Sequence, residues 1–195
     1  MTSDSIFTTL SHVWQALERA KIDGALMGGL AVTAWGYFRA TRDVDLLIAV
    51  DVADWSEAER RLVTAGFQMS RVRAPKRLDK LHVVKTECRL PEVLWELEVD
   101  FLLAESPYHR QAIARSVVFT FPNMSTSIRV LTCEDVILHK LDAGRMLDLA
   151  DCVELLRTNS TTIDNAYLDR VAVELGASAA LDEVRKRAAT NEALD

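Results

Sequence analysis

The chain contains little cysteine, and this excludes two kinds of structure. Three cysteines, Cys88, Cys133 and Cys152, are spread over 195 residues without a Cys-x-x-Cys spacing. An odd number at such spacings argues against a disulfide framework and against a zinc site. The four histidines are also scattered, with none four residues from another, so a histidine-based metal site is not indicated. Free cysteines are typical of a reducing compartment, and we expect the cytoplasm.

Long apolar runs and an excess of positive charge are missing too. No apolar stretch approaches the ~20 residues of a membrane span, and residues 1–5 lack the basic region of a signal peptide. We therefore expect no membrane partner. The formal net charge of −6 excludes a globally basic nucleic-acid binder. Neither a Walker phosphate loop nor a Gly-x-Ser-x-Gly nucleophile motif is present.

Positive charge is nevertheless concentrated in one segment around Pro75. Five of the ten residues from 71 to 80 are cationic: Arg71, Arg73, Lys76, Arg77 and Lys80. A solvated loop is one interpretation of such a run. The other interpretation is a site that binds a triphosphate or an RNA backbone.

Hydrophobic periodicity predicts a mixed sheet followed by helices. This order is typical of an α+β fold with a C-terminal helical bundle. We divide the chain into a core over residues 1–131 and a helical region over 132–195 packed on it. The expected strands are 24–28, 43–50, 66–73, 80–87, 93–104, 115–120 and 127–131. The expected helices are 5–21, 29–38, one ending at Gly66, 106–113, 132–143, 145–158, 164–175 and 178–189.

Two aspartates lie inside the expected strand 43–50. The strand period of two places Asp43 and Asp45 on one face, with Val44, Leu46 and Ile48 on the other. Aspartate is depleted in strands, and two neighbouring carboxylates repel each other. A divalent cation between them would turn this repulsion into attraction. The pair therefore indicates a metal site.

A glycine turn precedes the aspartate pair. Gly28 and Gly29 separate a short strand from a helix and let a ligand approach the backbone closely. The N–H groups at the start of that helix favour an anion. This turn is a candidate phosphate-binding site, and its position about a dozen residues before Asp43 suits a metal-bound nucleoside triphosphate.

A third carboxylate, Asp100, completes the pattern. Residues 95–103 alternate strictly, with Trp95, Leu97, Val99, Phe101 and Leu103 on one face, and Asp100 belongs to the polar row opposite. If this strand lies beside the strand of Asp43 and Asp45, the three carboxylates meet on one sheet face.

These motifs together resemble the nucleotidyltransferase superfamily, which has the DNA polymerase β-like fold. Residues 36–46 (GYFRATRDVDL) and 134–151 (EDVILHKLDAGRMLDLAD) look like the small bacterial nucleotidyltransferases related to AbiE-type abortive-infection toxins. The resemblance covers roughly residues 24–157. It implies a nucleotidyltransferase-like mixed sheet flanked by helices. Many relatives carry Gly-Ser where this chain has Gly28-Gly29.

The resemblance also implies roles for residues outside the sheet. Lys140 shares the apolar flank of its helix, so we expect a partly buried stem with the ammonium directed at a partner. By spacing alone, Asp148 and Asp151 would form a solvated face. By resemblance, Lys140, Arg145, Asp148 and Asp151 line the far side of the nucleotide pocket. Arg39 or Arg42 either neutralises triphosphate or forms a plain ion pair.

The expected reaction is transfer of a nucleotide from a nucleoside triphosphate (NTP) to an acceptor hydroxyl. Two Mg²⁺ ions would bind Asp43, Asp45 and Asp100, and Lys140 with Arg145 would stabilise the departing pyrophosphate. By analogy the acceptor is RNA, particularly tRNA, or a protein, in a toxin–antitoxin or phage-defence setting with an antitoxin as a further partner. The alternatives are an aminoglycoside-type small-molecule nucleotidyltransferase and a nucleotide-binding module without turnover.

Overall fold

A computed structural model describes residues 3–78, 81–90, 96–122 and 124–190. Lys80, and residues 93–95 at the start of the strand expected over 93–104, lie outside the described residues. The helices are α1 (Ser3–Ala20), α2 (Gly28–Ala34), the short 3-10 helix η1 (Val52–Asp54), α3 (Trp55–Thr64), α4 (Pro107–Arg115), α5 (Cys133–Ala143), α6 (Met146–Thr158), α7 (Asn165–Leu175) and α8 (Ser178–Thr190). The strands are β1 (Gly24–Met27), β2 (Asp43–Ile48), β3 (Met69–Val72), β4 (Lys76–Leu78), β5 (Leu81–Cys88), β6 (Leu97–Leu103), β7 (Val117–Phe119) and β8 (Ile128–Val130).

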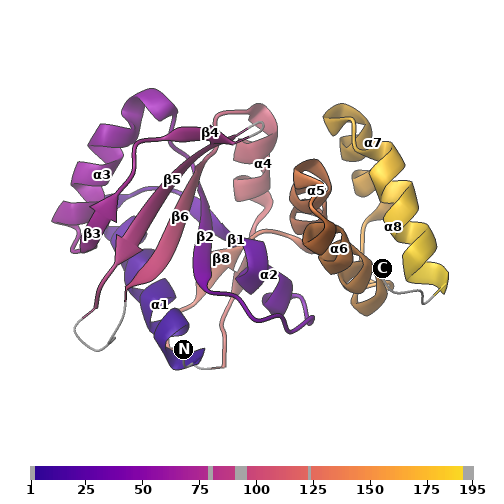
Figure 1. The fold of residues 1–195 in the computed structure, drawn as a ribbon, viewed down its shortest axis with the longest axis horizontal. Helices are drawn as coiled ribbons and strands as arrows, with labels where there is room; N and C mark the ends of the chain where they lie inside the picture. Colours follow the sequence, from indigo (N-terminus) through magenta and orange to yellow (C-terminus); the bar gives the residue numbers. More distant parts are fainter. Residues whose placement is uncertain (1–2, 79–80, 91–95, 123, 191–195) are drawn as a thin grey trace.

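The described strands form one mixed sheet in the order β3-β5-β6-β2-β1-β8-β7, with β4 paired to β5 (Figure 1). The β2–β6 and β1–β8 pairs are parallel, and the other pairs are antiparallel. This confirms the predicted α+β class. The parallel β2–β6 pair has a functional consequence, because it brings together two strands that are about 50 residues apart in the sequence.

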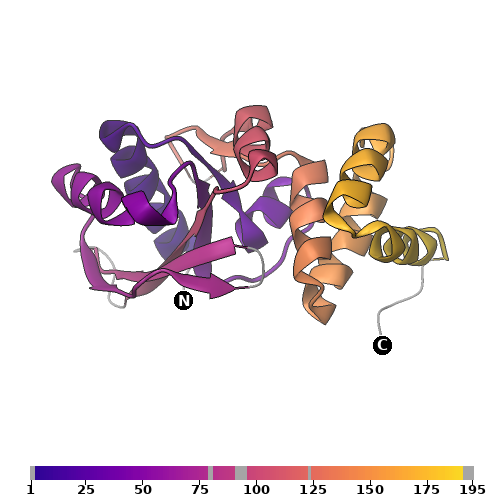
Figure 2. The ribbon, with the colours of Figure 1, turned by 90° about the horizontal axis from the view of Figure 1, so that it is seen from above.

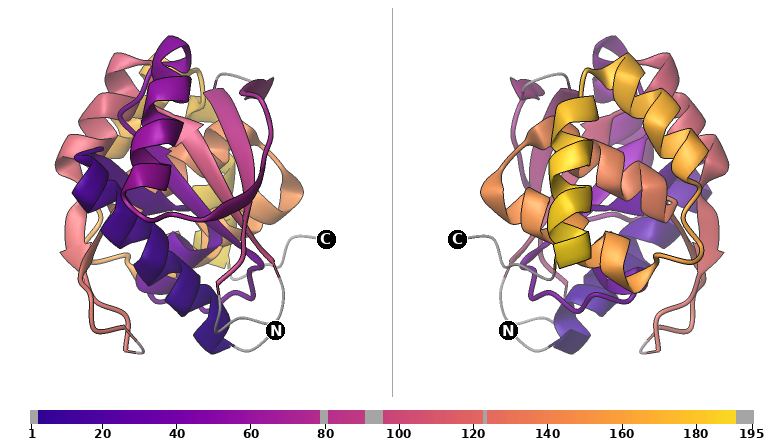
Figure 3. Two further views of the ribbon diagram at one scale, coloured as in Figure 1. Left: turned by 90° about the vertical axis from the view of Figure 1, so that its left-hand side faces the viewer. Right: turned by 90° about the vertical axis from the view of Figure 1, so that its right-hand side faces the viewer.

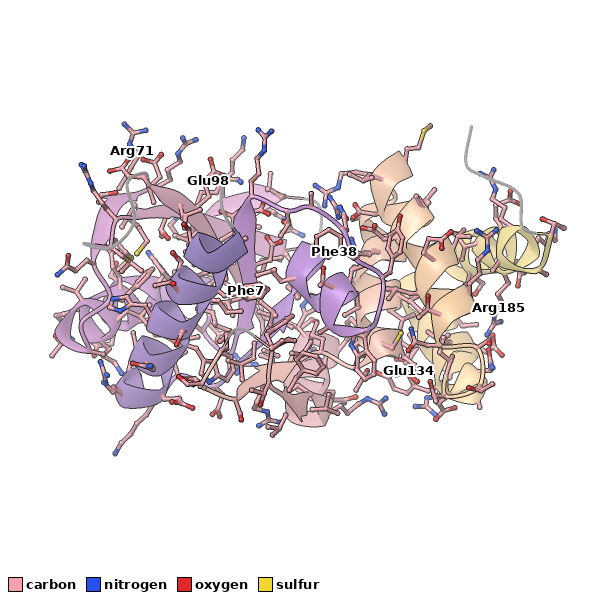
Figure 4. The ribbon with its side chains drawn as sticks, turned by 90° about the horizontal axis from the view of Figure 1, so that it is seen from below. Phe7, Phe38, Arg71, Glu98, Glu134 and Arg185 are labelled. Carbon is pink, nitrogen blue, oxygen red and sulfur yellow. The ribbon has the colours of Figure 1, made fainter. Side chains whose placement is uncertain are left out.

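The apolar side chains of the central strands are buried against helices on one face. Val44, Leu46 and Ile48 of β2 are fully buried, as the alternation predicts. Phe101 of β6 packs against Trp55 of α3, with ring centroids 5.6 Å apart. Figure 2 shows α1, α3 and α4 on this side of the strands. The labelled side chains of Arg71 and Glu98 point to the other side (Figure 4).

The C-terminal helices stand at one end of the sheet. Helix α5 contacts α2. Helix α7 packs on α5 and helix α8 packs on α6, and these two helices form the outer layer (Figure 3). Helix α5 begins where the sequence predicts, because the side chain of Thr132 accepts a hydrogen bond from the backbone N–H of Asp135. Buried apolar residues of these helices continue the core of the sheet. Among the described residues no helix has the length and apolar character needed to span a membrane.

The segments around the sheet edge and helix α2 differ from the prediction. Helix α2 ends at Ala34 rather than at 38, and Gly36 follows with a positive φ of 93°. The basic segment is not a plain loop, since parts of it form β3 and β4. These short strands pair with opposite ends of β5, which satisfies their backbone hydrogen bonds. The sequence predicts β3, which lies within the expected strand 66–73, but not β4, because pairing with β5 supplies most of the stability of so short a strand.

Candidate active site

The three predicted carboxylates lie on one face of the sheet. Strands β2 and β6 pair in parallel with Asp45 beside Asp100, and Asp43 lies beside Glu98. Paired residues of neighbouring strands project to the same side. The structure therefore brings Asp43, Asp45 and Asp100 onto a common surface, opposite the face that packs on the helices.

Each carboxylate has a different immediate neighbour. The hydroxyl of Thr41 donates a hydrogen bond to Oδ1 of Asp43 over 2.7 Å. The ammonium of Lys85 on β5 lies 2.7 Å from Oδ2 of Asp100. Asp45 packs directly on Gly28, where the Cβ of any other residue would lie 2.6 Å from its Cγ. Gly28 also has a positive φ of 65°, so both space and conformation require glycine there.

Burial and mutual repulsion make Asp45 a weaker acid than an ordinary aspartic acid side chain. Burial, followed by the charges of Asp43 and Asp100, raises the pKa of Asp45 from 3.8 to about 7, although Lys140 and Lys85 act in the opposite direction. Burial also raises the pKa of Asp100, even though Lys85 opposes this. The hydrogen bond to Asp100 in turn raises the pKa of Lys85. The site thus concentrates negative charge that is incompletely neutralised.

The chemistry of these oxygen donors fits a hard divalent cation. Oδ1 of Asp100 is buried, and no described residue forms a hydrogen bond to it, which leaves a lone-pair donor for a ligand. Mg²⁺ prefers carboxylate oxygens, and its charge would relieve the repulsion on Asp45. Within the described ranges, however, no three acidic, histidine or cysteine side chains already converge on a common metal position. The Mg²⁺ site therefore stays a prediction.

A buried ionic cluster lies behind the carboxylates, between α5 and α6. The ammonium of Lys140 is 2.9 Å from Oδ1 of Asp148 and 2.6 Å from Oδ2 of Asp151. Arg39 reaches the same Asp151 oxygen over 2.7 Å, and Arg145 reaches Asp148 over 2.6 Å. Burial alone would raise the pKa of Asp148, but Lys140 and Arg145 lower it overall. Three cations pair with two anions in this cluster, and a third carboxylate, Asp142, lies on the same wall of the neighbouring cavity.

This cluster corrects one interpretation from the sequence. Asp148 and Asp151 do not form a solvated face, because both are buried. They are the partners toward which the Lys140 ammonium projects. The plain ion pair considered for Arg39 is present, while Arg42 is exposed near the start of β2.

A cavity of about 310 Å³ separates the carboxylates from the cluster. Gly28 and Asp45 border it on the sheet side, and Lys140, Asp142, Arg145 and Asp148 border it on the helical side. Its remaining wall is mainly apolar and comes from the same sheet face and from α5: Met27, Leu78, Leu81, Val83, Leu102, Val136, His139 and Ala143. Burial lowers the pKa of His139 to about 3, which keeps this wall uncharged at neutral pH. The cavity therefore has one charged end and one apolar end.

Two polar contacts of the site were not predicted from the sequence. The sequence predicts only that Lys85 lies in a strand, because its position next to Asp100 depends on the antiparallel register of β5 and β6. Thr41 lies in the segment before Asp43, and the sequence indicates no role for it. A threonine two residues before an aspartate is a weak local signal for a hydrogen bond between the two side chains.

Solved structures show which known fold this arrangement matches. No protein-family model and no curated protein matches the chain. The structure of the antibiotic-resistance factor ANT(2'')-Ia aligns over 95% of this chain and 100% of that chain, with a TM-score of 0.57 and 16% identity. An antigenic nucleotidyltransferase-like protein from Paracoccidioides brasiliensis aligns over 93% and 94%, with a TM-score of 0.53 and 19% identity. The chain has the nucleotidyltransferase fold.

A third structure agrees with this fold. A protein from Thermotoga maritima covers 75% of this chain and 89% of its own length, with a TM-score of 0.53 and 18% identity. At such identities the likeness concerns the nucleotidyltransferase fold alone. The chemistry must therefore be argued from the residues of this chain.

Proposed function

We propose that this protein transfers a nucleotide from an NTP to an acceptor hydroxyl. One observation supports this above the others. Asp45 and Asp100 are register partners on one sheet face, with Asp43 on the same strand, and Asp45 borders a cavity whose opposite wall carries Lys140 and Arg145. Carboxylates and cations facing each other across a cavity suit a triphosphate that carries a divalent cation.

The residues on the two walls of the cavity have different roles in this proposal. Asp43, Asp45 and Asp100 would hold two Mg²⁺ ions, which when bound supply charge neutralisation and activation of the acceptor hydroxyl. The backbone at Gly28 and Gly29 lets the β- and γ-phosphates approach closely. Lys140 and Arg145, with Arg39 and Arg42 nearby, attract the phosphates electrostatically, and Asp148 and Asp151 hold Lys140 in place.

The transfer is a single displacement at phosphorus. The acceptor oxygen forms a bond to the α-phosphorus, and the bond from that phosphorus to the bridging oxygen breaks. Pyrophosphate leaves, and the hydroxyl proton passes to water. The protein's part is to position the two oxygens and to balance charge, since phosphoryl transfer needs little covalent participation from side chains.

The basic strands favour RNA as the acceptor, with tRNA as the first candidate. Arg71 pairs in register with Glu87, and the backbone N–H of Arg73 bonds to Lys85, so both cations lie next to the strand that carries Lys85. Both are exposed and border a small polar groove with Lys85, Glu87 and Glu98, in which Arg71 forms an ion pair with Glu87. Such cations can follow a phosphate backbone toward the carboxylates. A protein acceptor, an antitoxin partner, a relation to AbiE-type toxins and a toxin–antitoxin or phage-defence role belong to the same proposal.

A small-molecule acceptor is the second candidate, and the cavity is the observation that favours it. Its volume of about 310 Å³ falls at the lower end of the range for small-molecule pockets. Its apolar wall would bury the body of a compact acceptor beside Asp45. The proposed aminoglycoside-type reaction and the RNA reaction share all catalytic residues and differ only in the acceptor.

Incubation with each α-labelled NTP and Mg²⁺ tests the proposal. Total tRNA, a protein extract and a panel of aminoglycosides serve as acceptors, and the labelled product is identified by mass spectrometry. We expect label in tRNA and its complete loss in Asp45→Asn. Label in the drug alone would shift the assignment to the second candidate. Mg²⁺-dependent NTP binding with no product on any acceptor would identify a binding module instead.

Asp51→Asn is the matched control for that experiment. Asp51 lies just beyond the other end of β2 and pairs with Arg110 on the surface, so the same chemical change should leave transfer intact. Equal loss in both variants would indicate a general folding defect and would contradict the role assigned to Asp45.

A further inference from the structure

Thr41 makes a contact that none of the roles above requires. It lies in the loop between α2 and β2, and its hydroxyl donates to Oδ1 of Asp43 over 2.7 Å. This bond uses one lone pair of Oδ1. The rest of the carboxylate, including all of Oδ2, stays available, but its orientation about the side-chain axis is no longer free.

Thr41 is also held from the other side by the glycine turn. A Cβ on Gly29 would lie 2.8 Å from Oγ1 and 2.9 Å from Cβ of Thr41, which is closer than real Cβ atoms approach. The threonine side chain therefore fills the space in front of Gly29. A side chain at position 29 and the observed position of Thr41 exclude each other.

The loop that carries Thr41 is anchored at a second point. Arg39, two residues earlier, binds Asp151 over 2.7 Å, and Asp151 binds Lys140. The loop thus runs from the buried cluster of the C-terminal helices to the carboxylate on β2. With both ends attached to rigid elements, Thr41 has little freedom to leave Asp43.

We propose that Thr41 is a positioning residue that orients Asp43 for a divalent cation, with Gly29 supplying the space it needs. The inference rests on the proposed function, because it assumes that Asp43 binds the cation. Carboxylate ligands are themselves hydrogen-bonded, and loss of such an outer contact typically weakens metal binding by about 10- to 100-fold. Thr41 would act through Asp43 and touch neither substrate nor cation.

Calorimetry of Mn²⁺ and Mg²⁺ binding to the purified, nucleotide-free protein tests this role. Thr41→Val keeps the shape of the side chain and removes the hydroxyl, whereas Thr41→Ser keeps the hydroxyl. We expect the Val variant to bind the cation about 10- to 100-fold more weakly and the Ser variant to bind within a few-fold of the wild type. Thr64→Val is the matched control, because that hydroxyl bonds only a carbonyl of α3; we expect its affinity to be unchanged.

The outcomes separate this inference from the proposed function. If the wild type binds no divalent cation, the proposed function itself fails. If the wild type binds and Thr41→Val binds equally well, only the role of Thr41 is overturned. Equal weakening in Thr41→Val and Thr41→Ser, with lowered melting temperatures in both, would assign Thr41 to packing and also overturn it.

Gly29→Ala tests the contact between Thr41 and Asp43 by changing the residue that Thr41 packs against. The added methyl group must displace Thr41 from Asp43, so we expect weakened cation binding similar to that of Thr41→Val. Cation affinity equal to the wild type in a folded Gly29→Ala variant would contradict the proposal, since it would show that Asp43 does not depend on this packing.

Discussion

The carboxyl group of Asp45 ionises differently in this site than an aspartic acid side chain does in water. It is half-buried, lies against Gly28, and faces the charges of Asp43 and Asp100. Its carboxyl therefore resists ionisation until pH values near 7, whereas the same group in the unfolded chain ionises near 3.8. Between these values the folded state binds more protons, so the folded state loses stability as the pH rises.

Asp45→Asn should therefore stabilise the metal-free protein at high pH. We expect its free energy of unfolding to exceed that of the wild type by about 2 to 4 kcal/mol above pH 7, at about 1.4 kcal/mol for each unit of pKa difference. The difference should shrink as the pH falls toward 4, because the carboxyl of the unfolded wild type then begins to bind the proton that the folded state already holds. Denaturant unfolding between pH 4 and pH 8 measures this. A stability difference that does not vary with pH would contradict the raised pKa of Asp45.

Helices α5 and α6 are joined by charge as well as by apolar packing. Lys140 is buried, and both of its carboxylate partners, Asp148 and Asp151, come from α6. Removing one member of a buried ion pair costs more than the pair itself contributes, because the remaining charge stays desolvated. The cluster thus fixes the spacing of two helices and one wall of the cavity at the same time.

Lys140→Met should destabilise the fold strongly by leaving two buried carboxylates without their ammonium partner. We expect a loss of about 3 to 5 kcal/mol in the free energy of unfolding, measured by urea denaturation at pH 7.5. The loss should diminish toward pH 3, because the buried Asp148 becomes protonated more readily once Lys140 no longer lowers its pKa. Lys186→Met, at an exposed position of α8, is the matched control and should change stability by less than about 0.5 kcal/mol. Comparable effects of the two variants would argue against the cluster.

The molecule as a whole presents the two faces of its sheet to different surroundings. Helices α1, α3 and α4 cover one face (Figure 2), and the other carries the carboxylates together with Lys85 of β5. The side chain of Arg71 on β3 points to this second side as well (Figure 4). A chain with a net charge of −6 thus places two exposed arginines of β3, Arg71 and Arg73 (the basic strip), near the acidic site, although Arg71 also pairs with Glu87. This polarity favours an anionic polymer entering from the β3 edge.

Reversing the charge of Arg71 and Arg73 tests that direction of approach. Arg71→Glu combined with Arg73→Glu should weaken tRNA binding at least about tenfold and should reduce the salt dependence of log K by about one for each lost phosphate contact. Fluorescence anisotropy at several salt concentrations measures both quantities. Lys186→Glu with Arg187→Glu on α8 is the control and should leave both unchanged. Unaltered tRNA binding in the β3 variant would exclude the basic strip as the RNA path.

Local patterns predicted most of the elements but not their partners. The alternation around Asp100 predicted a strand with one polar face, and β6 has that strand with Leu97, Val99 and Phe101 buried. Nothing local, however, specifies that β6 lies beside β2 or that β5 places Lys85 next to Asp100, since strand register depends on contacts between distant segments. Asp148 and Asp151 illustrate the same limit: their spacing fits a solvated face, but the packing of α6 on α5 buries them.

The sequence by itself determined the α+β class, the polar face of β2 and β6, and the glycine turn, because each follows from backbone preferences and side-chain periods within a few residues. Only the tertiary structure decided that Asp45 and Asp100 are register partners, that Thr41 fills the space before Gly29, and that the Lys140 cluster closes the cavity. The long-range contacts among them join residues from about 12 to 112 positions apart, as in Gly29 with Thr41 and Arg39 with Asp151. Their energies depend on burial and charge that exist only after the chain has folded.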